Sequence, residues 1–430
     1  MIPPIRALSL AALLVLAGCS VPDLPTGSDG DDRLGVEGGY AATDPLPVRT
    51  DDGLNESERE AVLARTMARV EAIRGLEFTR DVEVRVVSRA EYRADRANET
   101  AADGGFREQV WEAPFLVGER TTVGRELDAV YGTAVGGYYA GDEIVIVSDT
   151  ETPTLDTRTL AHELVHALQA QHLGFGSDRR TLDGRFARDG LIEGDANAVE
   201  IAYEARCGDE WECLPRSDRA NLDEPAFDSD VYLVLIQPYA EGPAFVNALR
   251  ERGGWVAVND AYDRMPTTTE QVIHPERYPE ESPVEVRVED RSSDGWARFE
   301  REGPESTTLG EATVYAMFRA NGVVEGGERF DYSHPLSDGW AGDRLVPYHD
   351  GDEAGYVWRT EWDTERDARE FVRGYRDLLA ARGATRDGNV YVVPEGDPYA
   401  DAFRVTREGT TVTVVNAPTR GELDAVHRTE

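Results

Sequence analysis

The residues best suited to chemistry in this sequence are His162, Glu163 and His166, which lie in the apolar run TLAHELVHALQAQH. Residues four apart share one face of a helix, so the two imidazoles can reach a single metal ion. Glu163 lies on nearly the same face, where its carboxylate can accept a proton from a water molecule that the metal activates. The spacing therefore predicts a hydrolytic site built on a zinc ion (Zn²⁺).

An apolar pattern surrounds this motif. Leu160, Leu164, Val165 and Leu168 recur at the spacing of a helix face, which predicts a buried helix. Its polar groups would then point into the protein. The alternative is a helix whose two histidines pack in the core or face solvent without binding a metal.

A catalytic zinc site needs a third protein ligand and leaves the fourth position to water. His172 lies six residues after His166, as in HExxHxxGxxH enzymes, but Gln169 stands where those enzymes have glycine. Without that glycine the helix would continue and carry His172 about 9 Å further along its axis. We therefore expect His172 to end the helix before Gly174.

Glu193 is the preferred third ligand. It lies in the block LIEGDA (191–196), which we expect to open a second helix, and a carboxylate flanked by Leu and Ile needs a partner. Glu200, two turns further on, is the alternative ligand, or else a surface or supporting group. Asp195 or Asn197 is available to orient a ligating histidine through its second ring nitrogen.

These motifs together resemble a known group of enzymes. HExxH followed at a distance by a helix-borne Glu resembles the gluzincin metallopeptidases. AHELVHALQ, LIEGDA and MPTTTEQVIHPERY (265–278) are similar to a family of haloarchaeal surface proteins, over about residues 55–280. The resemblance implies a zincin-like peptidase with His162, His166 and Glu193 as zinc ligands and Glu163 as general base. The chain lacks the NExxSD-type sequence that the best-studied members carry around their Glu ligand.

The tetrahedral oxyanion of peptide hydrolysis needs a hydrogen-bond donor besides the metal. His274 and Tyr278, both in the segment TTTEQVIHPERY, are the candidates for this catalytic role. The alternative for His274 and Pro275 is an ordinary turn. Upstream, residues 143–147 (EIVIV) predict a strand, which is either an edge strand that aligns a peptide substrate by β-augmentation or a plain core strand.

The composition is strongly acidic. There are 83 Asp and Glu against 45 Lys and Arg, the formal net charge is −38, and no residue is Lys. This predicts a halophilic protein, because the Debye length falls to about 3 Å in molar salt and the repulsion between acidic groups is then screened. A G+C-rich genome would also favour Arg over Lys. Nucleic acid and anionic membranes are excluded as partners on this basis, since a basic footprint is missing.

The N-terminal residues 1–19 predict a lipoprotein signal peptide. Arg6 precedes an apolar run at 7–17, which is shorter than the ~20 residues needed to span a bilayer. The run ends in LAGC, which resembles a signal whose Cys19 becomes the lipid-bearing N-terminus. We expect an exported protein anchored by Cys19 to the outer face of the cytoplasmic membrane, with ordinary secretory cleavage as the alternative. Residues 20–53, rich in Asp, Gly and Pro, predict a disordered acidic tether.

Two cysteines remain in the mature chain, Cys207 and Cys213. We expect them to close a small disulfide loop outside the cell, the alternative being two free thiols. The triplets 55–57 and 98–100 fit N-glycosylation acceptors, which agrees with export.

The fold class is predicted to be α+β, with a zincin-like metallopeptidase domain at 54–285 and a smaller α+β domain at 286–430. The first domain should contain a helix at 55–73, a strand at 82–87 and a helix-rich part at 228–263.

The second predicted domain should hold a helix at about 363–382 and strands in YVWRTEW, NVYVV and TVTVV. His334, His349 and His427 lie there without metal-ligand spacing, so we expect surface or packing roles for them.

Two functions from different classes remain open. The first is a cell-surface zinc peptidase that acts on peptide or protein substrates. The second is a non-catalytic structural or binding lipoprotein that retains a zincin-like fold. The intact HELVH motif and Glu193 favour the peptidase, since a non-catalytic relative would usually lose one of these residues.

Overall fold

The computed structural model describes residues 33–428 apart from 47, 49, 51–52, 98–103, 151–154, 178 and 216–229. The predicted signal peptide with Cys19 and the triplet 98–100 therefore lie outside the described residues. Within the described ranges, no helix is both long and apolar enough to cross a membrane. Helices and strands are both abundant and largely segregated, so the α+β class is confirmed.

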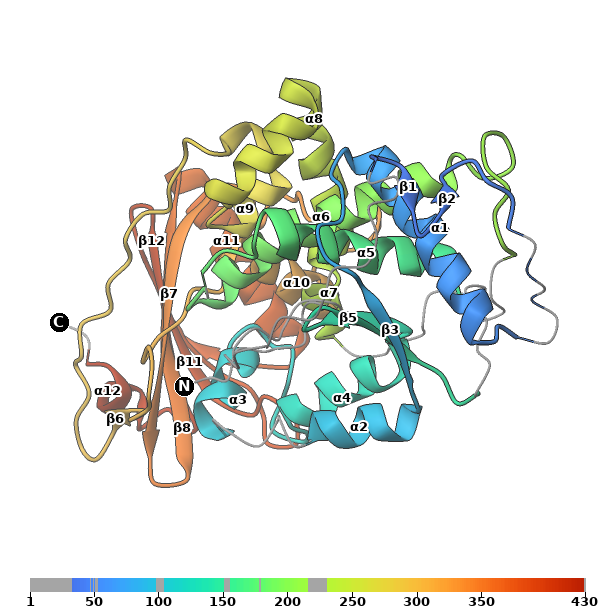
Figure 1. Ribbon diagram of the computed structural model, residues 1–430. Coiled ribbons are helices and arrows are strands. Elements are labelled where there is room, and N and C mark those ends of the chain that lie inside the picture. Colours follow the sequence, from blue (N-terminus) through green and yellow to red (C-terminus); the bar gives the residue numbers. More distant parts are fainter. Residues whose placement is uncertain are drawn as a thin grey trace.

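The first part of the chain is mainly helical and surrounds a small sheet (Figure 1). Its helices α5, α6 and α8 occupy the centre and top of the view, and the small sheet lies beneath α5. The elements are α1 (Glu56–Arg74), β3 (Glu83–Val87), α2 (Arg89–Ala97), α3 (Gly104–Glu112), α4 (Val123–Ala134), β4 (Gly137–Ala140), β5 (Glu143–Val147), α5 (Thr157–His172), α6 (Leu182–Glu204), α7 (Tyr232–Leu235), α8 (Gln237–Asp263) and α9 (Thr269–Ile273).

A short hairpin precedes these elements and corrects the prediction of a disordered tether. β1 (Val36–Glu37) and β2 (Tyr40–Ala41) pair antiparallel and lie against α1. The backbone N–H of Gly35 donates to Glu71 on α1 at 2.8 Å. The glycines that suggested disorder instead form the turn, since Gly38 and Gly39 have φ of 53° and 84°. The tether prediction is therefore wrong for this part of 20–53.

The small sheet has the strand order β3-β5-β4, with β5 parallel to β3 and antiparallel to β4. β5 is thus the middle strand, and its side chains at 144–147 are buried. The edge-strand interpretation of residues 143–147 is wrong, and the core-strand alternative is confirmed. The edge beside α5 belongs to β4 instead.

Helix α6 begins earlier than predicted. It starts at Leu182, where the Thr181 side chain accepts a hydrogen bond from the Gly184 N–H, so the block at 191–196 lies in mid-helix. Glycines are tolerated there because another helix crosses in backbone contact: a Cβ on Gly194 would lie 2.4 Å from the Gly242 carbonyl of α8. This close crossing fixes α6 and α8 relative to each other.

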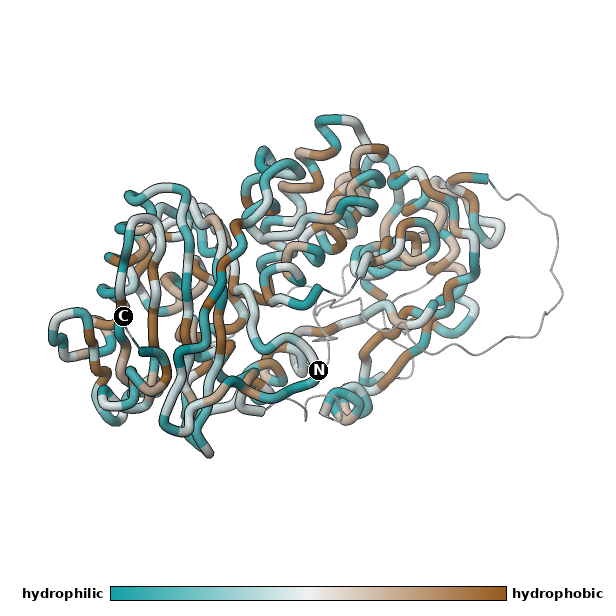
Figure 2. The backbone as a smooth tube through the Cα atoms, turned by 90° about the vertical axis from the view of Figure 1, so that its left-hand side faces the viewer, coloured by the Kyte–Doolittle hydropathy of each residue, from teal (hydrophilic) through white to brown (hydrophobic). Residues whose placement is uncertain are grey.

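The second part of the chain forms a seven-stranded antiparallel sheet in the order β6-β7-β8-β12-β11-β10-β9. Hydrophobic residues are frequent along its long strands (Figure 2), and the middle of β8 is buried on both faces, with Trp358 in one core and Val357 in another. The elements are β6 (Ala297–Arg298), α10 (Gly310–Ala320), β7 (Trp340–Asp350), β8 (Glu353–Trp362), α11 (Glu365–Ala381), β9 (Thr385–Asp387), β10 (Val390–Val392), β11 (Ala402–Glu408), β12 (Thr411–Ala417) and α12 (Leu423–Val426).

The two parts share their largest hydrophobic core. Buried residues of α3 and α4, such as Trp111 and Leu127, belong to the same cluster as Trp358 of β8 and Phe371 of α11. The packing thus continues across residue 285, where the sequence predicts a domain boundary. That division stays a prediction, and the large sheet supports the helical part directly.

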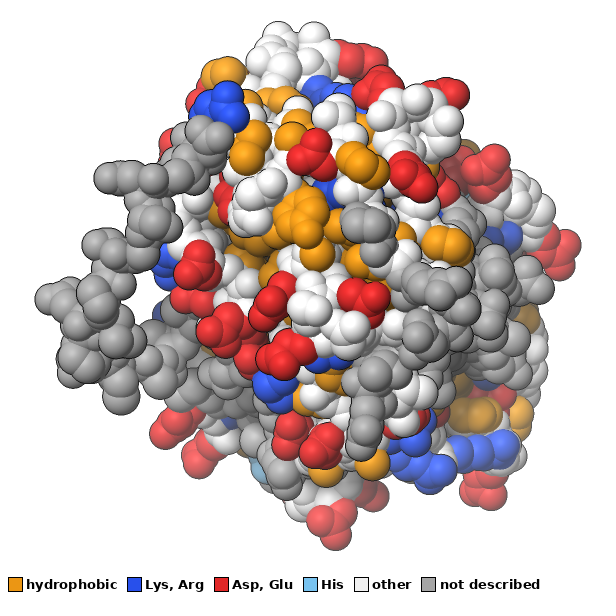
Figure 3. All heavy atoms as spheres, turned by 45° about the vertical axis from the view of Figure 1, so that its right-hand side comes forward, with side chains coloured by type: hydrophobic (Ala, Val, Ile, Leu, Met, Phe, Trp, Pro, Cys, Tyr) orange, Lys and Arg blue, Asp and Glu red, His pale blue; other side chains and the backbone are white. Residues whose placement is uncertain are grey.

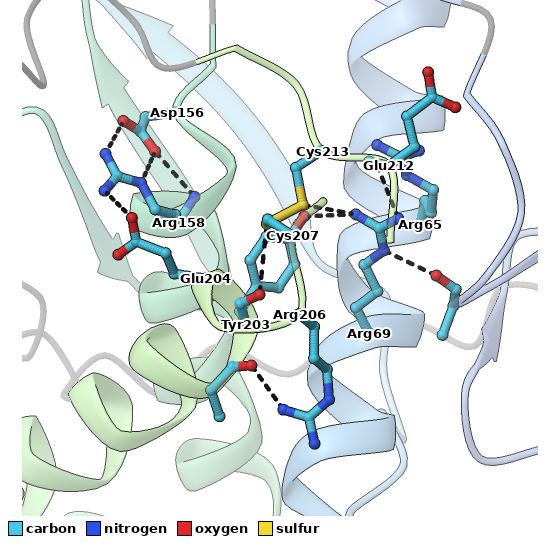
Figure 4. Close-up of a disulfide and its surroundings, with 12 residues drawn as sticks. Arg65, Arg69, Asp156, Arg158, Tyr203, Glu204, Arg206, Cys207, Glu212 and Cys213 are labelled. Carbon is cyan, nitrogen blue, oxygen red and sulfur yellow. Dashed lines mark hydrogen bonds and ion pairs between the residues drawn. A yellow bond between two sulfur atoms is a disulfide. The ribbon is translucent and has the colours of Figure 1, made fainter. Parts of the chain in front are cut away.

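The predicted disulfide between Cys207 and Cys213 is present at the end of α6. Figure 4 shows the Arg69 side chain of α1 directed at this loop. Its guanidinium donates to the Tyr203 hydroxyl and to the Glu212 carbonyl, each at 3.0 Å, and lies over the Trp211 ring. The loop therefore attaches the end of α6 to α1.

Acidic side chains are spread over much of the face drawn in Figure 3, whereas basic side chains gather in a few places. This distribution follows from the net charge of −38. It makes any local excess of arginine on the surface unusual.

Candidate metal centre

Helix α5 carries the HExxH residues on a face that is buried inside the protein. The Asp156 side chain caps its first turn by accepting from the Arg158 N–H, and α5 packs on α6, α1 and β4. His162, Glu163 and His166 are all at least nine-tenths buried. A buried helix face with three ionisable groups needs internal partners, because burying a polar group without one is costly.

The carboxylate of Glu193, on α6, lies close to both histidines of α5. Its Oε2 lies 3.2 Å from His162 Nε2 and 3.5 Å from His166 Nε2. Potential ligand atoms of the two histidines and Glu193 all lie within 4.8 Å of one another, and all three residues are buried. This cluster could hold a metal ion, with two imidazole nitrogens and a carboxylate oxygen as ligands.

A chain of hydrogen bonds fixes the orientation of His166. Its Nδ1 lies 2.8 Å from Gln169 Oε1, and the Gln169 amide donates in turn to the Ile192 carbonyl and to Asp195. Because the amide nitrogen of Gln169 is committed as a donor, its oxygen accepts from Nδ1–H. His166 therefore turns the lone pair of Nε2 towards Glu193.

Asp195 is itself held by a buried ion pair. Arg74 of α1 contacts both Asp195 oxygens, at 2.8 and 3.2 Å, and the Tyr262 hydroxyl of α8 donates to Asp195 at 2.9 Å. The prediction that Asp195 orients a ligating histidine is thus modified: Asp195 acts through Gln169. Three helices other than α5 contribute to holding one imidazole.

His162 is supported from its other side by Glu200, whose Oε2 lies 3.3 Å from His162 Nδ1. Glu200 is therefore a partner of a candidate ligand rather than a third ligand. Tyr239 of α8 stacks on the His162 ring at a centroid distance of 6.2 Å. His166 is thus oriented by a hydrogen bond to an amide oxygen, as is usual for metal-ligating imidazoles, while His162 has a carboxylate oxygen near its far nitrogen.

The unpartnered atoms and the ionisation of Glu193 show that the cluster fits a cation. His166 Nε2 and Glu193 Oε1 are buried and have no hydrogen-bond partner among the described residues. Burial acts to raise the pKa of Glu193, but the nearby imidazoles of His166 and His162 outweigh it and hold the pKa at about 2. Glu193 is therefore ionised at neutral pH, and a bound cation would supply the positive charge beside it that the imidazoles otherwise provide.

Glu163 has the environment of a base. Burial raises the pKa of its carboxyl to about 7, against the opposing effect of the His162 and His166 imidazoles. A backbone hydrogen bond from Tyr139 of β4 contributes to holding the group, and Oε2 has no partner within the described part of the chain. A pKa near 7 suits a residue that accepts and returns a proton at neutral pH.

Comparison with known proteins assigns no activity to this cluster. Residues 278–427 match a family described as a domain of unknown function (DUF8575). That match covers less than half of the chain and begins after all of the cluster residues. The sequence matches no curated protein, and no solved structure matches it.

Tyr278, predicted as a catalytic donor, is bonded elsewhere. The Tyr278 hydroxyl donates to the Arg264 carbonyl at 2.7 Å, and its ring packs edge-on against Phe245 in a separate core. It is therefore committed to packing and is not available to an oxyanion. His172 ends α5 as predicted, with Nε2 2.6 Å from the Glu77 carbonyl.

His274 belongs to a second cluster. Its Nε2 lies 3.0 Å from Glu311 Oε1 on α10 and 4.0 Å from Asp338 Oδ1. These three groups also lie within 4.8 Å of one another, but Asp338 is 40% exposed and its Oδ1 already accepts from the His334 N–H. The structure brings His274 to Glu311 rather than to the HExxH residues.

The rest of the TTTEQ block has a structural role. The Thr269 backbone and hydroxyl both donate to buried Asp183 of α6, at 2.8 and 2.6 Å, and the Thr269 hydroxyl accepts from the Ala312 N–H of α10. The block thus joins α9 to α6 and α10. Of the remaining histidines, His349 packs on Phe299 and His334 accepts from the Leu336 N–H.

Sequence reasoning missed two supporting residues. Gln169 follows His166 by three positions on the same helix face, a spacing that could have suggested a partner for the imidazole. Tyr239 had no such signal, since it lies on another helix and reaches His162 only through the crossing of α6 and α8.

Proposed function

We propose that this protein is a zinc-dependent peptidase with His162, His166 and Glu193 as ligands and Glu163 as general base. The observation that carries the proposal is the buried convergence of two imidazole nitrogens and one carboxylate oxygen within 4.8 Å. Support comes from the buried Gln169, Asp195 and Arg74 chain, which orients one of the proposed ligands.

The donor set together with the HExxH spacing favours zinc. Two histidines and one carboxylate with an open fourth position make a typical catalytic zinc site, and a Glu next to the first of two histidines four apart on a helix is the zinc peptidase arrangement. Zinc would supply a Lewis acid that polarises a carbonyl and favours ionisation of water. Glu163 would accept a proton at its unpartnered Oε2 and return it to the leaving amine.

The surroundings suggest how a peptide would be held. Within the described residues β4 is an edge strand and lies beside α5, so an extended substrate could align along it. The ring of Tyr239 stacks on His162, whereas the Tyr278 hydroxyl donates to the Arg264 carbonyl, so Tyr239 is our candidate donor to the developing oxyanion. We assign that role to Tyr239 in place of the residues that the sequence suggested.

The proposed location is the cell surface. The disulfide between Cys207 and Cys213 fits an oxidising compartment outside the cytosol. An export signal ending at Cys19 and the acidic, lysine-free composition are the sequence grounds for a lipid-anchored protein of a halophile. Peptides or proteins at that surface would be the substrates.

The first experiment is elemental analysis of the full chain purified in molar salt, followed by a peptide-library screen. We expect about one zinc per chain, because among the described residues only one cluster combines two histidines with burial of all its members. The variant E163Q should keep zinc and lose hydrolysis. A protein without zinc after reconstitution would reject the proposal and favour the non-catalytic binding protein.

A further inference from the structure

A groove lies on the surface of the second part of the chain, between α11 and the strands β9, β10 and β11. Its volume is about 970 Å³. Five arginines line it: Arg369, Arg373 and Arg376 from α11, Arg386 from β9 and Arg407 from β11. We call this surface the arginine groove.

The charge of the arginine groove opposes that of the whole chain. Its lining contains five arginines against two carboxylates, Asp377 and Glu408, whereas the chain has 83 acidic and 45 basic residues. Glu365 lies 3.2 Å from Arg369 and 3.8 Å from Arg407, so these two cations are partly neutralised. An excess of positive charge remains at the middle of the groove.

That remaining charge has no internal partner. Arg373 and Arg376 make no hydrogen bond or ion pair with other described residues, and the Nε of Arg376 is buried. Guanidinium groups without carboxylate partners are free to bind a ligand that supplies acceptor oxygens.

We propose that the arginine groove binds an acidic peptide segment through its carboxylates. Arginine forks match carboxylates in a bidentate geometry, and all of the unpaired groups here can donate. The ligand must therefore bring acceptor oxygens.

The shape of the groove favours a peptide over a single small anion. Arg369, Arg373 and Arg376 are spaced four and three residues apart, so they form a row about 10 Å long on one face of α11. Alternate side chains of an extended peptide are about 6.6 Å apart, which allows two carboxylates to meet this row. Val372 and Val405 give the groove an apolar floor that an inorganic ion would not use.

The sheet offers a second contact. β9 carries Arg386 and is the terminal strand of the sheet as far as the described residues extend. Its outer backbone edge is open to an extended chain, which gives binding by β-augmentation. Binding here does not require the metal cluster, whose residues belong to α5 and α6.

The test is fluorescence anisotropy with the full chain and a labelled peptide rich in Asp and Glu. A peptide with Asn and Gln at the same positions is the ligand control. We expect R373A and R376A each to weaken binding of the acidic peptide about tenfold or more, the usual effect of losing a hydrogen bond to a charged group.

The matched control is R366A. Arg366 lies on the same helix but outside the groove, with its side chain 72% exposed and paired with Glu370. Equal binding of the acidic and amide peptides would overturn the proposal, as would R373A and R376A variants that bind like R366A. Displacement of the peptide by equimolar inorganic sulfate would also overturn it, because the site would then take a small oxyanion.

Discussion

Two clusters in this protein contain the same chemical groups in different surroundings. His162, His166 and Glu193 form one, while His274 and Glu311 with Asp338 form the other. Each brings nitrogen and carboxylate atoms within 4.8 Å, the first requirement for a metal site.

The surroundings separate them. In the first cluster every residue is buried, and each imidazole has an oxygen partner on its far nitrogen, from Gln169 or Glu200. In the second, one imidazole faces one buried carboxylate and one that is 40% exposed. The difference indicates that residue types alone do not make a metal site: the ligands must also be oriented and shielded from water.

The largest expected difference between the two clusters is in catalysis. E163Q should reduce peptide hydrolysis by about 10²–10⁴-fold, because Gln cannot accept the proton that a general base takes. Its zinc content should stay the same, since Glu163 is not a proposed ligand. Initial rates and elemental analysis of the same sample would test both parts, and undiminished hydrolysis would remove Glu163 from the mechanism.

The second largest difference between the two clusters is expected in their metal content. E193A should lower zinc affinity by more than the 10–100-fold typical of residues that only support a ligand. H274A should keep about one zinc per chain, because His274 pairs with Glu311 and not with the proposed site. Competition with a chromogenic chelator measures both variants. Zinc lost from H274A but retained in E193A would reverse the assignment of the two clusters.

The second cluster should instead appear in the pH dependence of stability. Burial raises the pKa of Glu311 to about 7 although His274 acts to lower it. Burial acts to lower the pKa of His274, but Glu311 and Asp338 outweigh this effect and raise it. Both groups bind protons more tightly when folded. Their stabilising contribution is therefore complete below the unfolded pKa values and is lost as pH rises through the folded ones.

For Glu311 the loss would amount to about 3 kcal/mol between about pH 4.5 and pH 7. E311Q should flatten the fall in the free energy of unfolding over this range, measured by denaturant titration at several pH values. E276Q, an exposed carboxylate of the neighbouring turn, is the control and should leave the profile unchanged. If the pH profile were the same in E311Q and wild type, the raised pKa of the buried Glu311 would be contradicted.

The metal ligands were accessible from the sequence because they follow a helical period. His162 and His166 are four apart, and Glu193 lies in an apolar stretch where a lone carboxylate needs a partner. The α+β class and most elements followed from apolar periodicity in the same way, as with α11, predicted at 363–382 and observed at 365–381.

The errors concern contacts between elements far apart in the chain. Residues 143–147 read as a strand, but its central position depends on pairing with β3, about sixty residues earlier. The hairpin at 36–41 looked like a tether because its glycines favour turns and disorder alike. The sequence suggests Tyr278 as a donor to the oxyanion, but its hydroxyl donates to the Arg264 carbonyl instead. Local sequence patterns carry no information about such long-range contacts.

The smallest expected effect tests whether orientation is what distinguishes the metal cluster. Q169A removes the oxygen that accepts from His166 Nδ1 and leaves all three proposed ligands in place. Zinc affinity should fall about 10–100-fold, as for other residues that orient a ligating histidine. Q171A on the same helix is the matched control, because Gln171 is only half-buried and its hydrogen bonds go to the 79–80 segment rather than to the metal cluster. Equal affinities in the two variants would mean that burial of the ligands, rather than their orientation, separates this cluster from the one at His274.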